Sequence, residues 1–321
     1  MPAARARQVS RPKAEPRSAQ PSSPARCDIL KAPVFQDLPW LVHGFSTRYG
    51  GVSIPPYVTS KRGELNLGQV KWDTAASIAE NRRQFIEALP AKKFQLLTLN
   101  QIHSDLLRSY GAEGANAKAS NSDSPCRDSL RGDGQITAQP GLLLSILSAD
   151  CLPILIADTR QRVVAAIHAG WRGTLRRIAQ KGVGRMMMLH GSRPEDLRVA
   201  IGPGIRACCF EVGEDVLRAF ESQFNQSMKL FALPPERERP FAERHALMYR
   251  NVIKYPLLEK PKKYHLDLVM ANVSQLTEVG IAAKNIWTAA PCTHCHPRQF
   301  FSHRRDALRA GRMMSVIGIR P

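Results

Sequence analysis

Acidic residues are scarce in this chain. Its 321 residues include 27 Asp and Glu against 46 Lys and Arg, which gives a formal net charge of +19 at pH 7. A protein this basic favours anionic partners, either nucleic acid bound without sequence preference or small molecules that carry phosphate. The charge alone does not choose between these two classes of partner.

The sequence also has no apolar run that fits a membrane helix. Its most apolar stretch, Leu142–Ala157, contains Asp150, and an acid at the centre of a membrane helix costs roughly 2.5–3.5 kcal/mol. Met1–Arg26 has no apolar segment of the kind that a secretory signal needs, and its repeated prolines would interrupt the amphipathic helix of a transit peptide. This segment, in which Glu15 is the single acid, predicts a disordered basic tail. We therefore expect a cytoplasmic protein without membrane contact, in which residues 27–321 form the folded domain.

A regular cysteine framework is missing as well. The seven cysteines are odd in number and unevenly spaced, which predicts free thiols in a reducing compartment. Cys292-Thr-His-Cys-His296 fits the C-x-x-C-H pattern of c-type haem attachment, but that attachment requires export, which is not signalled here. A second metal site from Cys292, Cys295, His296 and His303 is an alternative; otherwise these are packed thiols and surface imidazoles.

The two apolar runs Pro153–Ala157 and Val163–Ala169 predict a pair of antiparallel strands. Both are short and separated by four polar residues. A two-residue turn would place Cys151 opposite His168, and a wider loop would place Pro153 there. In either register the thiol and the imidazole come close, because directly paired side chains have Cβ atoms about 4.5–5.5 Å apart. For the pair alone, a core cysteine beside a hydrogen-bonded core histidine is the simpler interpretation.

Gly170-Trp171-Arg172-Gly173-Thr174 follows this second strand and leads into a segment with helical spacing of apolar residues. A glycine-flanked turn at a helix start presents free backbone N–H groups, and Arg172 adds a fixed positive charge. An anion such as phosphate would bind well there. Alternatively, the glycines only let the chain turn and Arg172 is solvated.

The remaining pattern alternates strands with helices and predicts an α/β fold. His103 lies in Gln101-Ile-His-Ser104, at the end of a predicted strand, where open α/β sheets usually place their chemistry. Ser77 and Glu80 have capping-box spacing ahead of a helix. Strands are expected at Trp40–Thr47, Phe94–Leu99, Ile136–Thr137, Leu197–Ile201 (followed by Cys208-Cys209), Ile286–Ala289 and Met313–Ile319, helices at Glu211–Phe224 and His265–Val279, a loop at Arg48–Gly51, a surface loop containing Cys126 at Gly111–Arg131, and an excursion at Gln226–Lys263.

Eight motifs in order resemble the YfiH/laccase-domain family over about Val34–Ile319. They are His43-Gly-Phe-Ser-Thr-Arg48-x-Gly-Gly-Val-Ser53, Asn66-Leu-Gly68, Gln101-x-His103-Ser104, Asp133-Gly-x-Ile-Thr137, Ser148-Ala-Asp-Cys151-x-Pro153, His168-Ala-Gly-Trp-Arg-Gly173, Ile201-Gly-Pro203 and Phe300-Phe-Ser-x-Arg-Arg-Asp306. The resemblance implies a single-domain α-β-β-α layered sandwich with mixed sheets. Older descriptions call such proteins polyphenol oxidases or multicopper-oxidase-like, and the later assignment is purine nucleoside phosphorylase with adenosine deaminase activity. Cys295, His296 and His303 depart from the family pattern, which concerns the rim of the substrate site.

The metal ligands of that family match His103, Cys151 and His168. Zinc takes imidazole nitrogen and thiolate sulfur, and a catalytic zinc site keeps three protein ligands and one open position. A water in that position would have its pKa lowered toward 7 and could attack C6 of adenine, which is deamination.

Phosphorolysis instead requires phosphate to reach C1′ of the ribose while the purine leaves. Arg48 and Arg172 are the candidates for holding phosphate or polar groups of the substrate, and Gln101 and Asp133 are polar neighbours without an assigned role. The partners implied are purine nucleosides and inorganic phosphate, with no specific nucleic acid; nothing in the sequence defines the oligomeric state.

Copper is the alternative metal, because two histidines and a cysteine also suit a blue-copper centre. A true laccase further needs a trinuclear cluster with roughly eight more histidines, whereas this chain has nine in total. The sequence therefore favours a zinc-dependent purine nucleoside phosphorylase, acting on adenosine, inosine, guanosine and methylthioadenosine, with adenosine deaminase activity. A copper-dependent phenol oxidase and a non-enzymatic nucleic-acid binding protein are the alternatives.

Overall fold

The computed structural model describes residues 27–55, 63–111, 130–224, 227–232 and 263–321. The predicted basic tail lies outside the described residues, as do nearly all of the loop with Cys126 and of the expected excursion at Gln226–Lys263. Within the described ranges, no helix is long and apolar enough to span a membrane.

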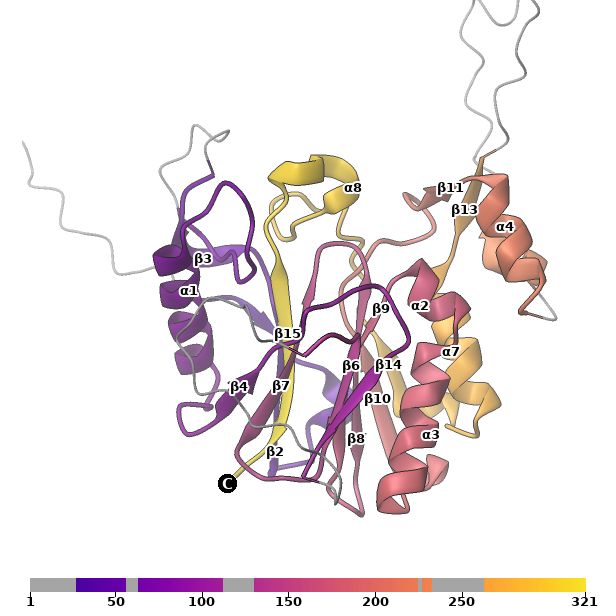
Figure 1. Cartoon of the computed structure of the whole chain (residues 1–321), viewed down its shortest axis with the longest axis horizontal. Helices are drawn as coiled ribbons and strands as arrows, with labels where there is room; N and C mark the ends of the chain where they lie inside the picture. Colours follow the sequence, from indigo (N-terminus) through magenta and orange to yellow (C-terminus); the bar gives the residue numbers. More distant parts are fainter. Residues whose placement is uncertain (1–26, 56–62, 112–129, 225–226, 233–262) are drawn as a thin grey trace, which may run out of the picture.

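Two sheets stand side by side at the centre of the protein (Figure 1). The five-stranded sheet has the order β1 (Ile29–Leu30), β2 (Leu41–Ser46), β15 (Met313–Ile319), β7 (Leu142–Ser148), β4 (Gln95–Leu97). The six-stranded sheet has the order β14 (Ile286–Thr288), β10 (Leu197–Ile201), β8 (Leu152–Asp158), β9 (Val164–Ala169), β6 (Gly134–Thr137), β5 (Leu107–Tyr110). Both sheets contain parallel and antiparallel pairs, so both are mixed, as expected.

The two sheets share a buried core. Leu144 and Ile317 of the first sheet belong to one apolar cluster with Leu155, Val164 and Ala200 of the second. Because successive side chains of a strand point to opposite faces, the neighbours of Leu155 in β8 pack outward against helices instead. Burial on both faces explains why the strand sequences are continuous apolar runs rather than alternating ones.

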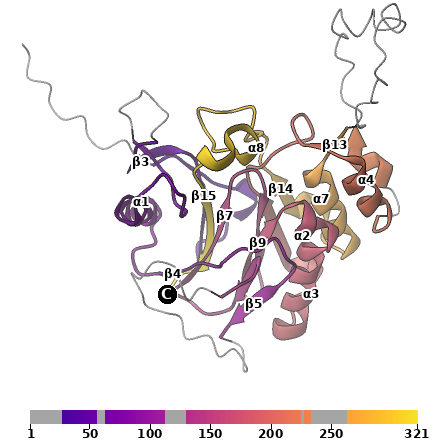
Figure 2. The same ribbon diagram turned by 45° about the horizontal axis from the view of Figure 1, so that its top comes forward.

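Helices cover both outer faces and complete the α-β-β-α layers. Helix α1 (Ala75–Ala88) packs Phe85 on the outer face of the five-stranded sheet. Helices α3 (Ile178–His190) and α7 (Leu268–Glu278) cover the six-stranded sheet from the opposite side, which Figures 1 and 2 show in two views. The layered fold implied by the sequence resemblance is therefore confirmed.

The hairpin of β8 and β9 takes the wider of the two predicted registers. Pro153 lies opposite His168, and Leu152 lies opposite Ala169. The connecting loop is held by Asp158, whose carboxylate accepts the N–H groups of two following residues at 2.8 Å each. Cys151 therefore precedes the paired part of β8 and lies on the connection from β7.

The start of helix α1 corrects one prediction. The N-cap is Thr74, whose hydroxyl accepts the N–H of Ser77 at 3.1 Å, so the helix begins one turn before the expected capping box. Glu80 does not reach back to a cap, because its carboxylate pairs with Arg83 on the same helix.

Three further predictions differ from the structure because the residues concerned pair as β-strands. Tyr49–Ser53 forms strand β3 where a loop was expected, and edge strand β5 was not expected at all. Glu211–Val212 is strand β11, so helix α4 spans only Glu214–Glu221. Strand β11 pairs with β13 (Tyr264–Leu266), which also pairs with β12 (Phe231–Ala232), so α7 begins after β13, at Leu268.

Candidate metal centre

Three side chains from separate parts of the chain converge at one end of the two sheets. His103 comes from the connection between β4 and β5, Cys151 precedes β8, and His168 lies near the end of β9. Their ligand atoms all lie within 4.8 Å of one another. The two imidazole rings meet edge to face, with centroids 4.9 Å apart. The structure thus brings together the three residues that the sequence suggested as metal ligands.

The backbone around this group is unusual in two places. His103 has a φ of 56° and Asp150, next to Cys151, has a φ of 100°. For residues other than glycine, such conformations cost on the order of 1–3 kcal/mol and persist where surrounding contacts enforce them. The carboxylate of Asp150 provides such contacts, because it accepts the hydroxyl of Thr293 and the N–H of Arg304 at 2.6 Å each.

Gly170 leaves room for the group. A Cβ at this position would lie 2.9 Å from the sulfur of Cys151 and 3.4 Å from a ring carbon of His103. The Gly-Trp-Arg-Gly turn therefore needs glycine at residue 170 for close approach to the ligands.

Asp133 is the fully buried carboxylate behind these ligands. One oxygen accepts Nδ1–H of His168 at 2.9 Å and the N–H of His103 at 3.0 Å. The other accepts the N–H and the hydroxyl of Ser104 at 2.6 and 2.7 Å. Burial raises the pKa of Asp133, but the hydrogen bonds from His168 and Ser104 outweigh burial and lower it to about 2. The carboxylate is therefore ionised, fixes the His168 ring and leaves its Nε2 free to bind a metal.

The electrostatics favour the metal-binding form of the thiol. Burial raises the pKa of Cys151, but the adjacent His168 and His103 outweigh burial and hold it below its usual range. Burial lowers the pKa of His168, but Cys151 and Asp133 beside it raise that pKa above its ordinary value. A thiolate next to an imidazolium is the result, and a divalent cation can take the place of the imidazolium proton.

The donor set fits zinc. Ligands at about 2.0–2.3 Å from a common ion lie roughly 3.3–3.8 Å apart in a tetrahedron, so small side-chain movements bring three donors within 4.8 Å into that geometry. His103 is exposed and His168 is buried, so the group opens to solvent on one side only. Among the described residues, the other group of potential ligands consists of four cysteines and contains no histidine, which does not match a trinuclear copper cluster.

The other predicted site residues are placed differently. Gln101 uses both amide atoms on the backbone of Leu147, donating to its carbonyl and accepting its N–H at 2.8 Å each. Arg48 forms an ion pair with Glu64, donates to the carbonyl of Pro297 at 2.6 Å, and lies 4.8 Å above the ring of Phe301. Both side chains are therefore engaged within the fold.

Arg172 stands on the first turn of the short helix α2 (Trp171–Leu175). Its guanidinium lies 4.4 Å above the ring of Trp171, its side chain is exposed, and among the described residues it has no acidic partner. Within the described ranges, the hydrogen-bond donors of Arg172 thus remain available, two residues after Gly170, which borders the metal group.

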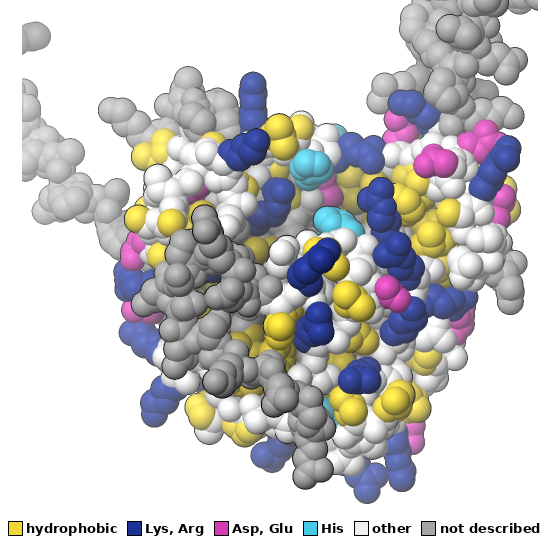
Figure 3. Space-filling view, viewed as in Figure 1, with side chains coloured by type: hydrophobic (Ala, Val, Ile, Leu, Met, Phe, Trp, Pro, Cys, Tyr) yellow, Lys and Arg dark blue, Asp and Glu magenta, His cyan; other side chains and the backbone are white. Residues whose placement is uncertain are grey.

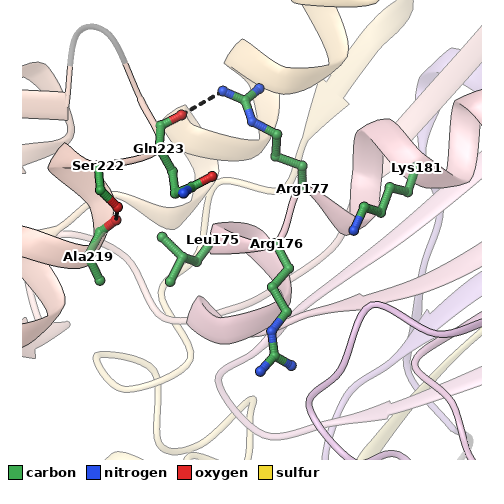
Figure 4. Close-up of a pocket in the computed structure, with 7 residues that line it drawn as sticks. All are labelled: Leu175, Arg176, Arg177, Lys181, Ala219, Ser222 and Gln223. Atoms are coloured by element: carbon green, nitrogen blue, oxygen red, sulfur yellow. Dashed lines mark hydrogen bonds between the residues drawn. The ribbon is translucent and has the colours of Figure 1, made fainter.

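Positive charge surrounds this end of the protein. Figure 3 shows Lys and Arg side chains around the part of the face where His side chains reach the surface, with few acids among them. A cavity of about 440 Å³ nearby is lined in part by Arg176, Arg177 and Lys181 (Figure 4). Arg177 bonds the carbonyl of Gln223 at 2.7 Å and pairs with an acid on α7, and Lys181 pairs with Asp105, so this cavity is less available to an anion than the rim at Arg172.

The sequence alone assigned no role to Ser104, Asp150 or Thr293, although Ser104 and Asp150 lie in motifs that carried the family resemblance. Ser104 and Asp150 each adjoin a ligand in the sequence, and Thr293 donates its hydroxyl to Asp150 from another loop. The role of these residues becomes clear only when the loops are placed in space.

Comparison with known proteins gives a consistent result. A family model described as multi-copper polyphenol oxidoreductase laccase matches residues 42–320. A purine nucleoside phosphorylase of Deinococcus radiodurans is 36% identical over 277 residues, which cover 86% of this chain and 88% of that protein. An adenosine deaminase named RL5, from an unknown prokaryotic organism, is 33% identical over 185 residues, or 58% of this chain and 61% of that protein.

The crystal structure of YlmD from Geobacillus stearothermophilus has the same fold, with a TM-score of 0.71 at 30% identity, and the match covers 94% of this chain and 98% of that one. Because the family model spans the two sheets, the covering helices and all three converging ligands, the chain belongs to the multi-copper polyphenol oxidoreductase laccase family, the laccase-domain family of YfiH and YlmD.

Proposed function

We propose that this protein is a zinc-dependent purine nucleoside phosphorylase that also deaminates adenosine. The observation that carries the proposal is the open group of two histidines and one thiolate, oriented by a buried carboxylate, in a chain whose relatives are named for these two activities. The proposed substrates are adenosine, inosine, guanosine and methylthioadenosine, with inorganic phosphate as the second substrate.

Each ligand has a distinct place in the proposal. Zinc held by His103, Cys151 and His168 would supply Lewis-acid chemistry at the open side of the group. Asp133 keeps the Nδ1 proton on His168 and therefore keeps Nε2 as the ligand atom. Exposed His103 borders the side from which substrate enters.

Arg172 is the proposed phosphate ligand. In phosphorolysis a phosphate oxygen bonds to C1′ of the ribose, the bond from C1′ to the purine nitrogen breaks, and the departing base takes up a proton. A guanidinium with free donors can hold that phosphate through two parallel hydrogen bonds. Arg48 is the second candidate, because it lines a cavity of about 470 Å³ with Tyr49 and Arg298, although Glu64 already neutralises much of its charge.

Gln101 and Asp133 act as positioning residues in this proposal. Gln101 joins the His103 connection to strand β7 through Leu147. Asp133 joins the same connection to His168 on β9. Together they fix the separation of two ligands that come from different sheets and loops.

The catalytic domain is proposed to span residues 27–321, because the two sheets of that region share one apolar core. The six cysteines of the described residues are all free, which supports a reducing compartment such as the cytoplasm. Phenol oxidation by copper is the alternative function, favoured by the description of the family model and by the ability of such a ligand set to hold copper.

One experiment distinguishes zinc-dependent nucleoside chemistry from copper-dependent phenol oxidation. Protein loaded with either zinc or copper is incubated with adenosine, inosine and methylthioadenosine, with and without phosphate, and the products are separated by mass. We expect free base and ribose 1-phosphate only when phosphate is present, and ammonia from adenosine without it, both in the zinc form. Cys151→Ala is the negative control. Phenol oxidation by the copper form, with no nucleoside turnover by the zinc form, would reject the proposal.

A further inference from the structure

Four cysteine sulfurs gather on the loops that face the back of the metal centre. Cys208 and Cys209 follow strand β10, and Cys292 and Cys295 follow strand β14. Their sulfur atoms all lie within 4.8 Å of one another, and Cys295 is 3.7 Å from Cys208 and 3.2 Å from Cys209. The sequence alone suggested Cys292 and Cys295 with two histidines instead.

Those two histidines do not belong to the group, because the ligand atoms that lie within 4.8 Å of one another are the four sulfurs alone. Nδ1 of His296 lies 2.9 Å from the carbonyl oxygen of Cys292, and Nδ1 of His303 lies 3.1 Å from that of Ala307. The donor set is therefore four sulfurs, which is a soft set that selects zinc among the common divalent ions of the cell.

The spacing of the sulfurs matches a tetrahedral ion. Four thiolates at about 2.3 Å from zinc lie roughly 3.8 Å apart. The separations of Cys295 from Cys208 and Cys209, 3.7 and 3.2 Å, both lie below this value, and every other pair is within 4.8 Å. Shifts of less than about 1 Å would complete the site.

Backbone N–H groups surround one sulfur of the group. The N–H of Arg206 points at the sulfur of Cys292 at 3.4 Å. The N–H groups of Cys295 and His294 also lie beside this sulfur. A sulfur that receives several N–H groups from its own turn is the arrangement by which proteins orient cysteine ligands on a metal.

The two loops are also fixed to each other. Gly204 forms a parallel bridge with Cys292, and the N–H of Thr293 donates to the carbonyl of Gly204 at 3.1 Å. The guanidinium of Arg206 donates to the carbonyl of Ala289 at 2.8 Å. The cysteines are thus presented by a braced pair of loops, so little conformational entropy is lost when an ion binds.

We propose that Cys208, Cys209, Cys292 and Cys295 bind a second zinc ion. Each sulfur gives up any proton it carries to solvent as it binds the ion. Four protein ligands fill the tetrahedron and leave no position for substrate, so this site is structural rather than catalytic.

The second ion would stabilise the proposed catalytic centre from behind. Thr293, next to Cys292, donates its hydroxyl to Asp150, and Asp150 immediately precedes the ligand Cys151. The N–H of Ile205 donates to the carbonyl of Asp150 at 2.8 Å, so both cysteine-bearing loops contact the same residue. Joining these loops through one ion therefore holds the strained backbone at Asp150 in place.

Zinc content measured per chain tests the proposal, using full-length protein purified under reducing conditions. Wild-type protein should carry about two zinc ions, and Cys151→Ala and Cys295→Ser should each carry about one. Cys27→Ser is the matched control, because Cys27 is a free thiol outside both groups, and it should keep both ions. X-ray absorption of zinc in the Cys151→Ala protein should show four sulfur neighbours at about 2.3 Å.

Three results would overturn the proposal. The first is a zinc content that is the same in wild-type protein and in Cys295→Ser. The second is a folded Cys151→Ala protein that contains no zinc. The third is a disulfide, seen as an intact wild-type mass that is two hydrogen atoms below the value for free thiols, when Cys209→Ser has the mass expected for free thiols. If Cys295→Ser does not fold, the absorption spectrum of Cys151→Ala still decides the question. Nucleoside turnover is not part of the readout, so failure of the proposed function and failure of this site are distinguishable.

Discussion

Replacing Asp133 with asparagine tests the proposed role of the buried carboxylate at the metal centre. The side chain keeps its shape, but one of its two oxygens becomes an NH₂ group. One carboxylate oxygen receives Ser104 N–H and O–H and, more weakly, the N–H of Ile102 at 3.3 Å; the other receives His103 N–H and His168 Nδ1–H. Both sides of the carboxylate therefore face donors.

Neither orientation of the new amide satisfies these donors. With its NH₂ toward Ser104, at least two buried donors lose their acceptor, at about 1–3 kcal/mol for each group left unsatisfied. With its NH₂ toward His168, the imidazole is driven to carry its proton on Nε2, which then cannot bind zinc. Loss of a hydrogen-bond partner behind a metal-bound histidine typically costs about 10–100-fold in metal affinity or activity. We expect a loss of this size in zinc affinity and in kcat/KM for adenosine.

Competition with a coloured chelator measures the zinc affinity, and urea unfolding measures stability. Asp158→Asn is the matched control, because Asp158 is also a fully buried carboxylate that accepts backbone N–H groups, but it lies at the turn between β8 and β9. It should lose stability while keeping zinc affinity. Ser104→Ala removes one bond to Asp133 and should give a smaller effect in the same direction.

The proposed role of Asp133 is wrong if Asp133→Asn binds zinc and turns over adenosine within about twofold of wild type. That role is also wrong if Asp158→Asn loses as much zinc affinity, because the effect would then follow stability rather than the orientation of His168.

Three further predictions concern the rim, the room for the ligands and a buried histidine. Arg172→Leu should depress phosphate-dependent cleavage of inosine about tenfold more than ammonia release from adenosine, and Arg172→Lys should recover part of that loss. Equal losses in both reactions with an unchanged phosphate KM would indicate that the anion site is at Arg48 instead. Gly170→Ala should weaken zinc binding, because its Cβ would meet Cys151 at 2.9 Å and overpacking costs about 1–3 kcal/mol, and unchanged zinc titrations would contradict this. Burial, followed by the charge of Lys31, lowers the pKa of His43 to about 4. Between about pH 6.5 and 4, His43 therefore binds a proton in the unfolded chain but not in the folded one. The free energy of unfolding should therefore decrease as the pH is lowered, by about 2 kcal/mol at pH 5 relative to pH 7 in urea unfolding. If a His43→Gln variant shows the same decrease, the pH dependence comes from other groups.

The sequence by itself determined the local parts of this protein. Largely apolar runs of five to seven residues predicted β8, β10 and β15 closely, because strands buried on both faces carry few polar side chains. The two runs that form β8 and β9 placed Cys151 near His168, since a hairpin leaves only a few possible registers. The resemblance to the laccase-domain family added His103 to this pair.

Only the tertiary structure decided which polar side chains meet. Asp133 and His168 are 35 positions apart, and Cys209 and Cys295 are 86 apart. No periodicity relates residues at such distances, because their contact depends on how two sheets and several loops pack. For the same reason the sequence could group Cys295 with nearby histidines but not with Cys208 and Cys209. It also could not reveal that the amide of Gln101 bonds to strand β7, or that Arg172 has no acidic partner within the described ranges.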